Sequence, residues 1–256
     1  MSRGSASVEL KGVDSQPSPH MNSIAAIKSK KELPSSKFLE NITVTTTDGD
    51  SVKLSSLWKH QDVVLKVLPR LGCRLCKYEA QSLGELRMLT DPSAVALAAV
   101  CFTGPDLQTF LSNGYWAWEI FLDDAREVYR KAELHRFTRW EAVKNYLSKY
   151  FKAMSSYVDH EFAFPNNFRG DRLQLGGTFI IRKGGEMLYQ FKPTKLAMYP
   201  SIKEMYSCLG GNPDDIEEPT PAEFVFTQEE SRAVGNTVMK SNSGLFHRTS
   251  TAPQAY

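Results

Sequence analysis

Two short segments of the chain alternate apolar and polar residues. The alternation runs over residues 42–46, stops at Asp48-Gly49 and resumes over residues 52–54. A period of two is typical of half-buried strands, and an Asp-Gly dipeptide between two such segments is typical of a hairpin turn. We therefore expect a β-hairpin over residues 42–54.

A buried strand and an amphipathic helix come next, with a cysteine between them. Residues 63–68 form a β-branched run that a proline and a glycine end, as expected for a buried strand. From residue 74 to about residue 90, apolar side chains recur at helical spacing while charged ones fall elsewhere. Cys73 thus lies just past the end of a strand and at the start of a helix.

The alternation of strands and helices continues beyond this helix. Residues 95–102 and 118–122 have the composition of buried strands, and residues 105–111 and 124–134 have that of helices. Strands joined through helices lie parallel to one another. The centre of the sheet is therefore expected to consist of mostly parallel strands.

The last regular segments are a second hairpin and a closing helix. Residues 177–181 and 186–191 flank Lys183-Gly184-Gly185, which is a turn sequence, and residues 201–209 have helical spacing. With both hairpins added, the fold class is α/β, a single domain with a central mixed sheet flanked by helices.

Three segments do not follow this pattern. Residues 1–36 and 213–256 are polar and contain too little apolar surface to offset the entropy of ordering, so we expect disordered tails around a domain at residues 37–212. Residues 135–172 interrupt the alternation with a helical piece at 140–151 and then an irregular aromatic stretch. We interpret that segment as an insertion or lid.

Charge and hydropathy exclude several classes of function. The 31 basic and 29 acidic residues give a net charge of +2, and the basic residues are scattered, so no nucleic-acid surface is indicated. The longest apolar run, residues 94–102, is too short to span a bilayer, and no apolar signal segment follows a basic start. We expect a soluble cytoplasmic protein without a transmembrane segment.

The candidate chemistry is the pair Cys73 and Cys76. A helix N-terminus stabilises a thiolate, and Arg70, Arg74 and Lys77 add positive charge nearby. Such surroundings lower a cysteine pKa from roughly 8.5 to about 3.5–7.5. We predict that Cys73 is the attacking nucleophile and that Cys76, one helical turn later, resolves it as a disulfide.

Two other interpretations of the pair stay open. Both cysteines would also suit the core as small apolar residues, or they would form half of a zinc site. A zinc site needs a second pair of ligands, and the remaining cysteines and histidines offer none at suitable spacing: Cys101, Cys208, His135 and His160. We therefore predict no metal ligands, and no phosphate-loop or dinucleotide fingerprint indicates cofactor-binding residues.

The other cysteines and an aromatic group have more ordinary interpretations. Cys101 lies in an apolar strand and is expected to be a buried, inert thiol, and Cys208 is similar unless it is exposed. The aromatic residues around the strand at 118–122 could line a substrate pocket, but they are more typical of the core: Tyr115, Trp116, Trp118 and Phe121.

The chain also resembles a known family. The matching segments are Ser56-Leu57-Trp58, Leu71-Gly72-Cys73-Arg74-Leu75-Cys76-Lys77, Glu119-Ile120-Phe121-Leu122-Asp123 with Tyr129, and Leu175-Gly176-Gly177-Thr178-Phe179-Ile180-Ile181. Together they are similar to the peroxiredoxin-like 2 family, over about residues 40–212. Cys73 and Cys76 match the redox pair of that family, and Gly72 lies within the same motif.

The resemblance implies a fold and an activity. It implies an AhpC/TSA-type, thioredoxin-like domain in the cytosol that reduces a small lipid or organic peroxide. The implied substrate is the endoperoxide of prostaglandin H2 or prostamide H2, reduced to F2α products. NADPH is the implied ultimate reductant, reaching the pair through a thioredoxin-type protein, with no cofactor bound to this chain.

Three positions depart from related folds. Peroxiredoxins carry a Thr three residues before the attacking Cys and an Arg just before the Gly of the later strand, where this chain has Arg70 and Gly176. Our hypothesis is that Arg74 or Lys77 takes over the polarisation of the peroxide. The turn before Gly177 lacks the proline that thioredoxins place opposite their cysteines, which disfavours a general disulfide isomerase.

Two alternatives to the prostanoid reductase remain. One is a general antioxidant or redox-regulatory protein without a prostanoid substrate. The other is a non-catalytic thioredoxin-fold interaction protein whose C-terminal tail docks partners through Phe224-Val225-Phe226.

Overall fold

The structure is a computed structural model that describes residues 33, 35–91, 93–167 and 169–216. The described residues from Ser35 to Ile216 belong to one compact unit. Most of both predicted tails, with Phe224-Val225-Phe226, lies outside the described residues, so the predicted domain boundaries stay predictions.

One seven-stranded mixed sheet forms the centre of the unit, in the order β2-β1-β5-β4-β3-β6-β7. β3 pairs in parallel with β4, and β4 pairs in parallel with β5, whereas the other neighbours are antiparallel. The strands are β1 (Thr43–Thr46), β2 (Ser51–Lys53), β3 (Asp62–Val67), β4 (Val95–Cys101), β5 (Glu119–Leu122), β6 (Gly177–Ile181) and β7 (Met187–Phe191). Both predicted hairpins and the parallel centre are confirmed.

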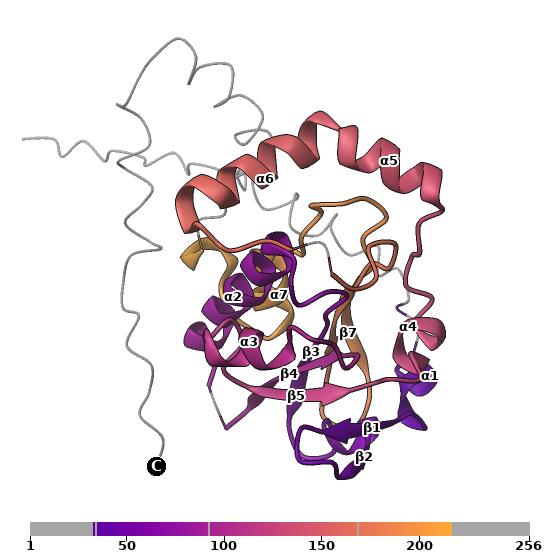
Figure 1. Cartoon of the computed structure of the whole chain (residues 1–256). Coiled ribbons are helices and arrows are strands. Elements are labelled where there is room, and N and C mark those ends of the chain that lie inside the picture. The colour runs from indigo at the N-terminus through magenta and orange to yellow at the C-terminus, as the bar shows by residue number, and fades with distance from the viewer. Residues whose placement is uncertain (1–32, 34, 92, 168, 217–256) are drawn as a thin grey trace, which may run out of the picture. The chain divides into compact units, whose positions relative to one another are not determined.

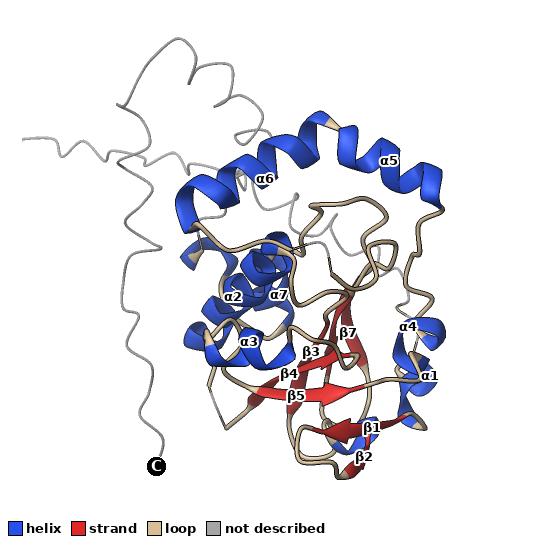
Figure 2. Ribbon diagram, viewed as in Figure 1, coloured by secondary structure: helices blue, strands red, loops and turns tan. Residues whose placement is uncertain are grey.

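Helices cover both faces of this sheet (Figure 2). The helices of the described residues are α1 (Lys37–Glu40), α2 (Arg74–Leu89), α3 (Leu107–Ser112), α4 (Glu127–Lys131), α5 (Arg139–Leu147), α6 (Lys149–Phe162) and α7 (Ile202–Cys208), with short 3-10 turns η3 (Leu54–Ser56) and η4 (Pro213–Asp215). None of the helices within these described segments is long and apolar enough to cross a membrane.

The alternation of β3 divides the core into two layers. Val63, Leu65 and Val67 pack with α1 and α4 on one face. Val64 faces the other way and packs in the cluster that contains the buried face of α2, and of α7 through Met205. Because successive side chains of a strand point to opposite faces, Lys66 is directed toward the α2 layer as well.

The helix predicted at residues 124–134 is shorter than expected. α4 begins late because both oxygens of Asp123 accept backbone hydrogen bonds, Oδ1 from Glu127 N at 2.9 Å and Oδ2 from Val128 N at 2.8 Å. Arg126 has a φ of 54° and Glu133 a φ of 51°, so left-handed residues bound the helix on both sides. Such residues interrupt a right-handed helix.

The prediction for residues 135–172 was wrong about its second half. The stretch after residue 151 was expected to be irregular, but α6 continues to Phe162. Ser148 begins this helix, because its hydroxyl accepts a hydrogen bond from the Phe151 N–H at 3.2 Å. α5 and α6 follow one another along one side of the unit, away from the sheet (Figure 1).

Candidate functional site

Cys73 is the N-cap residue of α2. Its backbone is extended, with φ −82° and ψ 126°, and its carbonyl accepts the first helical hydrogen bond from Lys77 N at 3.0 Å. Gly72 and the preceding loop bring the chain from the end of β3 to this point. The predicted order of strand, cysteine turn and helix is confirmed, and it places the Cys73 side chain beside unpaired N–H groups of the first turn.

The surroundings of Cys73 favour its thiolate. The pKa of Cys73 is lowered to about 6, first by a hydrogen bond from the Cys76 side chain, then by the positive charge of Arg70 and by the backbone N–H groups of Cys76 and Leu75, while burial opposes this shift. At neutral pH such a thiol is mostly ionised. Cys73 therefore has the character of a nucleophile.

Cys76 is perturbed in the opposite direction. Its pKa is raised well above the usual value, first by its hydrogen bond to Cys73, then by burial and by the negative charges of Cys73 and Glu79. Because the two thiols are coupled, they lose one proton near pH 6 and hold the second to much higher pH. Both thiols are free and half-buried in the structure.

Arg70 holds its charge beside the pair because a loop clamps it. Its Nη2 donates to Asn167 O at 3.1 Å, and Asn167 N donates to Gly72 O at 3.0 Å. A Cβ on Gly72 would lie 2.2 Å from Asn167 Oδ1, so any other residue would force the Asn167 amide to move. No local pattern indicated Asn167, because 95 or more residues separate it from Arg70 and Gly72.

Arg74 and Lys77 are tied to other groups. Arg74 forms a salt bridge with Asp159 of α6. Lys77 donates to Pro165 O at 2.6 Å and lies 4.9 Å from the centre of the Tyr115 ring. Burial lowers the pKa of Lys77, while Asp106 and then the cysteine pair oppose that shift. Arg70 is the guanidinium whose charge lowers the pKa of Cys73. Its position therefore suits the polarisation of the peroxide better than that of Arg74 does.

Packing explains why Gly176 carries no side chain. A Cβ at that position would lie 2.1 Å from Val67 O and 2.8 Å from Pro69 Cδ. An arginine there, as peroxiredoxins have it, would collide with the end of β3. The positive charge near Cys73 therefore comes from the cysteine loop itself, through Arg70.

A buried ion pair lies under the cysteine turn. Lys66 of β3, only 1% exposed, forms a salt bridge with Glu79 of α2, and its Nζ also lies 3.4 Å from Thr178 Oγ1. Glu79 is close enough to Cys76 to raise the pKa of that thiol. This pair was not predictable from the sequence, since a lysine in an apolar strand gives no indication of its partner.

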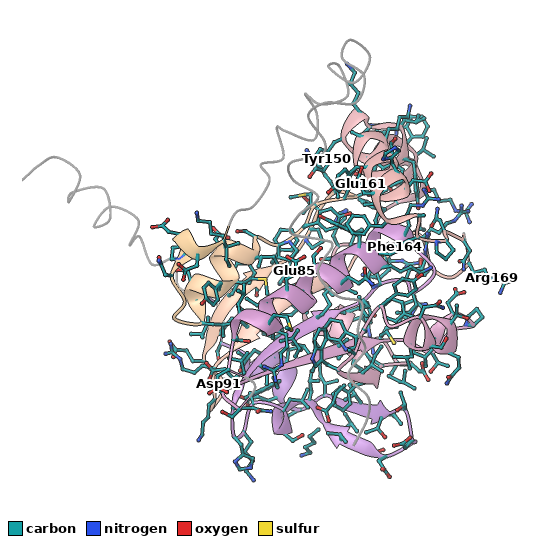
Figure 3. The ribbon with its side chains drawn as sticks, turned by 90° about the vertical axis from the view of Figure 1, so that its left-hand side faces the viewer. Glu85, Asp91, Tyr150, Glu161, Phe164 and Arg169 are labelled. Carbon is teal, nitrogen blue, oxygen red and sulfur yellow. The ribbon has the colours of Figure 1, made fainter. Side chains whose placement is uncertain are left out.

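An aromatic cluster covers Cys73 on the side of α6. Its buried members come from α2, α6 and the loop before α7, and they are Leu75, Tyr78, Met154, Val158 and Ala197. The half-buried residues that pack against them are Cys73, Tyr150, Phe151, Tyr157, Phe162, Phe164 and Tyr199. In Figure 3, Phe164 lies between α2 and α6. The segment predicted as a lid thus closes over the cysteine.

Tyr199 is a member of this cluster with an unusual hydroxyl. The oxygen is buried and has no hydrogen-bond partner among the described residues. Burial first, then the charges of Glu79 and the cysteine pair, raises the pKa of Tyr199 well above its usual value. The side chain is therefore a protonated donor near the thiols, and no local sequence pattern indicated it.

The remaining candidates belong to the core, as expected. Cys101 is 1% exposed, and burial raises its pKa to about 12. Cys208 is half-buried, and burial raises its pKa also. Of the four aromatic residues at or just before β5, Tyr115, Trp116 and Phe121 are buried and Trp118 is half-buried. This burial favours the core interpretation over a pocket.

Several known proteins are similar to this chain in sequence or in fold. The profile of the AhpC/TSA antioxidant enzyme family matches residues 84–195. The chain is similar to a thioredoxin-like protein from Aeropyrum pernix, with 15% identity, a TM-score of 0.41 and coverage of 75% of this chain and 94% of that one. It is also similar to peroxiredoxin Q of Xanthomonas campestris, with 12% identity, a TM-score of 0.42 and coverage of 76% and 97%. The family profile places the matched residues in the class of AhpC/TSA-type antioxidant proteins.

Curated relatives define the family within that class. A prostamide/prostaglandin F synthase of Danio rerio is 30% identical over 186 residues, which are 72% of this chain and 92% of the relative. The protein of the same name from Homo sapiens is 32% identical over 163 residues, 63% of this chain and 82% of the relative. The chain belongs to the peroxiredoxin-like 2 family, and the resemblance noted in the sequence is confirmed.

Proposed function

We propose that this chain is a thiol-dependent oxidoreductase that reduces the endoperoxide of prostaglandin H2 or prostamide H2 to F2α products through Cys73 and Cys76. The observation that carries the proposal is the opposite perturbation of the two thiols, with a pKa near 6 for Cys73 and a raised pKa for Cys76. One thiol is ready to attack, and the other keeps its proton until it is needed.

The reaction balances as a two-electron exchange. The Cys73 thiolate attacks one oxygen of the O–O bond, forms an S–O bond and releases the second oxygen as an alkoxide, which takes a proton. Cys76 gives up its proton and attacks the Cys73 sulfur, which displaces the first oxygen as the second hydroxyl. The products are a diol and a Cys73–Cys76 disulfide, so the dithiol is oxidised and the peroxide is reduced.

An external dithiol must then restore the pair. NADPH is the expected ultimate source of electrons, and a thioredoxin-type protein is the expected carrier. Exchange would begin with attack of the carrier's thiolate on the disulfide. A cytoplasmic location would supply both.

The surroundings of Cys73 support an apolar substrate. Phe162, Phe164 and Tyr150 pack in the cluster that contains Cys73. An apolar peroxide would gain burial against these rings, whereas hydrogen peroxide would gain none. The names of the curated relatives support the choice of a prostanoid.

The test is turnover of prostaglandin H2 by the purified chain with thioredoxin, thioredoxin reductase and NADPH. We expect F2α product and NADPH oxidation from the native chain, no turnover from Cys73→Ser, and no turnover from Cys76→Ser. Cys208→Ser is the matched control, because this half-buried thiol lies on α7 outside the pair, and it should keep full activity.

Two results would contradict the proposal in different ways. Turnover of simple hydroperoxides without any of prostaglandin H2 would make the chain a general antioxidant or redox-regulatory protein. A pair that never cycles with any peroxide would instead support a non-catalytic interaction protein.

A further inference from the structure

The outer face of α5 carries an apolar stripe that is exposed among the described residues. Trp140, Val143 and Leu147 are 67%, 46% and 64% exposed. Their spacing of three and four residues puts them on one face of the helix. The opposite face is the one that packs, because Ala142 is buried in a cluster with Phe137 and Leu175. α5 therefore carries apolar side chains on both its inner and its outer face.

Basic side chains flank this stripe. Arg139 and Lys144 lie on either side of it around the helix, and two more exposed lysines, Lys149 and Lys152, follow in the first turns of α6. Lys144 lies 5.7 Å from the centre of the Trp140 ring. Within the described part of the chain, none of these four cations forms a salt bridge.

The single carboxylate of α5 is already engaged. Glu141 accepts from Thr138 N at 2.7 Å in the capping box that begins the helix. Those hydrogen bonds from Thr138 lower the pKa of Glu141, so it stays ionised but is held at the end of the helix. Glu141 also interacts with the charge of Lys144, but the basic side chains around the stripe outnumber this one carboxylate, so the surface keeps a net positive charge.

We propose that this surface, Trp140, Val143 and Leu147 with Arg139, Lys144, Lys149 and Lys152, docks the protein on a membrane surface that contains anionic lipid. Tryptophan and aliphatic side chains between cations are the chemistry of an interfacial helix, in which the rings enter the headgroup region and the cations meet lipid phosphates and carboxylates. A protein partner would need an acidic rim around an apolar groove. A bilayer offers both features on any flat area.

This site is distinct from the redox pair and does not depend on the proposed function. The docking face and the cover of Cys73 nevertheless belong to consecutive helices, since α6 follows α5 after a single residue. Docking would place the cover of Cys73 next to the lipid phase, from which an apolar peroxide would arrive.

The experiment measures binding of the full chain to vesicles by co-sedimentation. We expect binding to vesicles of phosphatidylcholine with phosphatidylserine, weaker binding to phosphatidylcholine alone, and weakening by salt. The Trp140→Ser/Leu147→Ser double variant should bind at least about tenfold more weakly, because both side chains lose apolar burial. Lys144→Gln/Lys149→Gln should weaken binding to the anionic vesicles only.

Met88→Ser is the control, because Met88 is 85% exposed on α2 and its replacement removes exposed apolar surface elsewhere on the molecule. It should bind like the native chain. The proposal is overturned if the double serine variant binds as tightly as the native chain, if no vesicle of either composition binds, or if the native chain forms a dimer in solution that the double serine variant abolishes. A dimer of that kind would assign the stripe to a second copy of the chain.

Discussion

At the scale of single residues, Arg70 has the largest expected influence on Cys73 after its partner Cys76. Its guanidinium is held by Asn167 O and lowers the pKa of the Cys73 thiol. The sequence alone does not show which cation acts on Cys73, because Arg70, Arg74 and Lys77 all lie within the same loop and first turn. The structure separates them because Arg74 pairs with Asp159 and Lys77 with Pro165 O.

The pH dependence of Cys73 follows from that arrangement. The rate of alkylation by iodoacetamide, resolved by peptide mass, should be half-maximal near pH 6, level off at higher pH and fall at lower pH, because the thiol replaces the thiolate. Arg70→Met removes a charge that stabilises the thiolate, so its profile should shift to higher pH. Arg139→Met on α5 is the control. A native profile that rises only near pH 8.5, the usual thiol range, would contradict the account.

The buried hydroxyl of Tyr199 lowers the stability of the fold, which suggests that it serves the reaction instead. A buried hydroxyl without a partner costs about 1–3 kcal/mol, so Tyr199→Phe should raise the free energy of unfolding in urea. The same change removes a protonated donor near the thiols and should slow peroxide turnover by at least about tenfold. Unchanged turnover in a stabilised variant would leave Tyr199 a purely structural residue.

At the level of elements, the salt bridge between Lys66 of β3 and Glu79 of α2 is the contact whose disruption should lower the free energy of unfolding most. Glu79→Gln leaves the Lys66 ammonium buried without its carboxylate, and we expect a loss of about 3–5 kcal/mol in the free energy of unfolding. Lys66→Met/Glu79→Leu removes both charges and should be close to neutral. Urea unfolding followed by circular dichroism measures both.

A second measurement on the same variants separates stability from chemistry. Glu79 raises the pKa of Cys76, so the double variant should titrate Cys76 at lower pH than the native chain. An unaltered Cys76 titration would show that the charge of Glu79 does not reach the thiol.

The sheet was predictable from local pattern, whereas its long-range contacts were not. Period-two and β-branched runs predicted both hairpins and the parallel centre, because each signal lies within one segment. α6 was also within reach, since Phe151, Met154 and Val158 follow helical spacing after Ser148. The many aromatic residues of this segment obscure its helical period.

The candidate site was predictable only in part for the same reason. Cys73 and Cys76 are neighbours in sequence, and their position after a strand indicated the helix N-terminus. Asn167 and Tyr199 reach the pair from distant loops, and Lys66 meets Glu79 across two elements. No spacing in the sequence relates these residues to one another.

At the scale of the whole molecule, the cover formed by α6 decides access to Cys73. Met154 is 1% exposed in the cluster that contains Cys73, and truncating a buried methionine leaves a cavity. Met154→Ala should therefore speed hydrogen exchange in α6 and alkylation of Cys73, with β3 and β4 unchanged. Faster exchange throughout the sheet would instead mean that α6 and the sheet unfold together.

The central claim, that Cys73 and Cys76 work as one redox pair, is tested most directly by a single turnover. The reduced chain is mixed with one equivalent of prostaglandin H2, quenched with acid and mapped by peptide mass. The account predicts one F2α product per chain and an intramolecular Cys73–Cys76 disulfide. Product formation with Cys76 still reduced, or with a disulfide that involves Cys101 or Cys208, would contradict it.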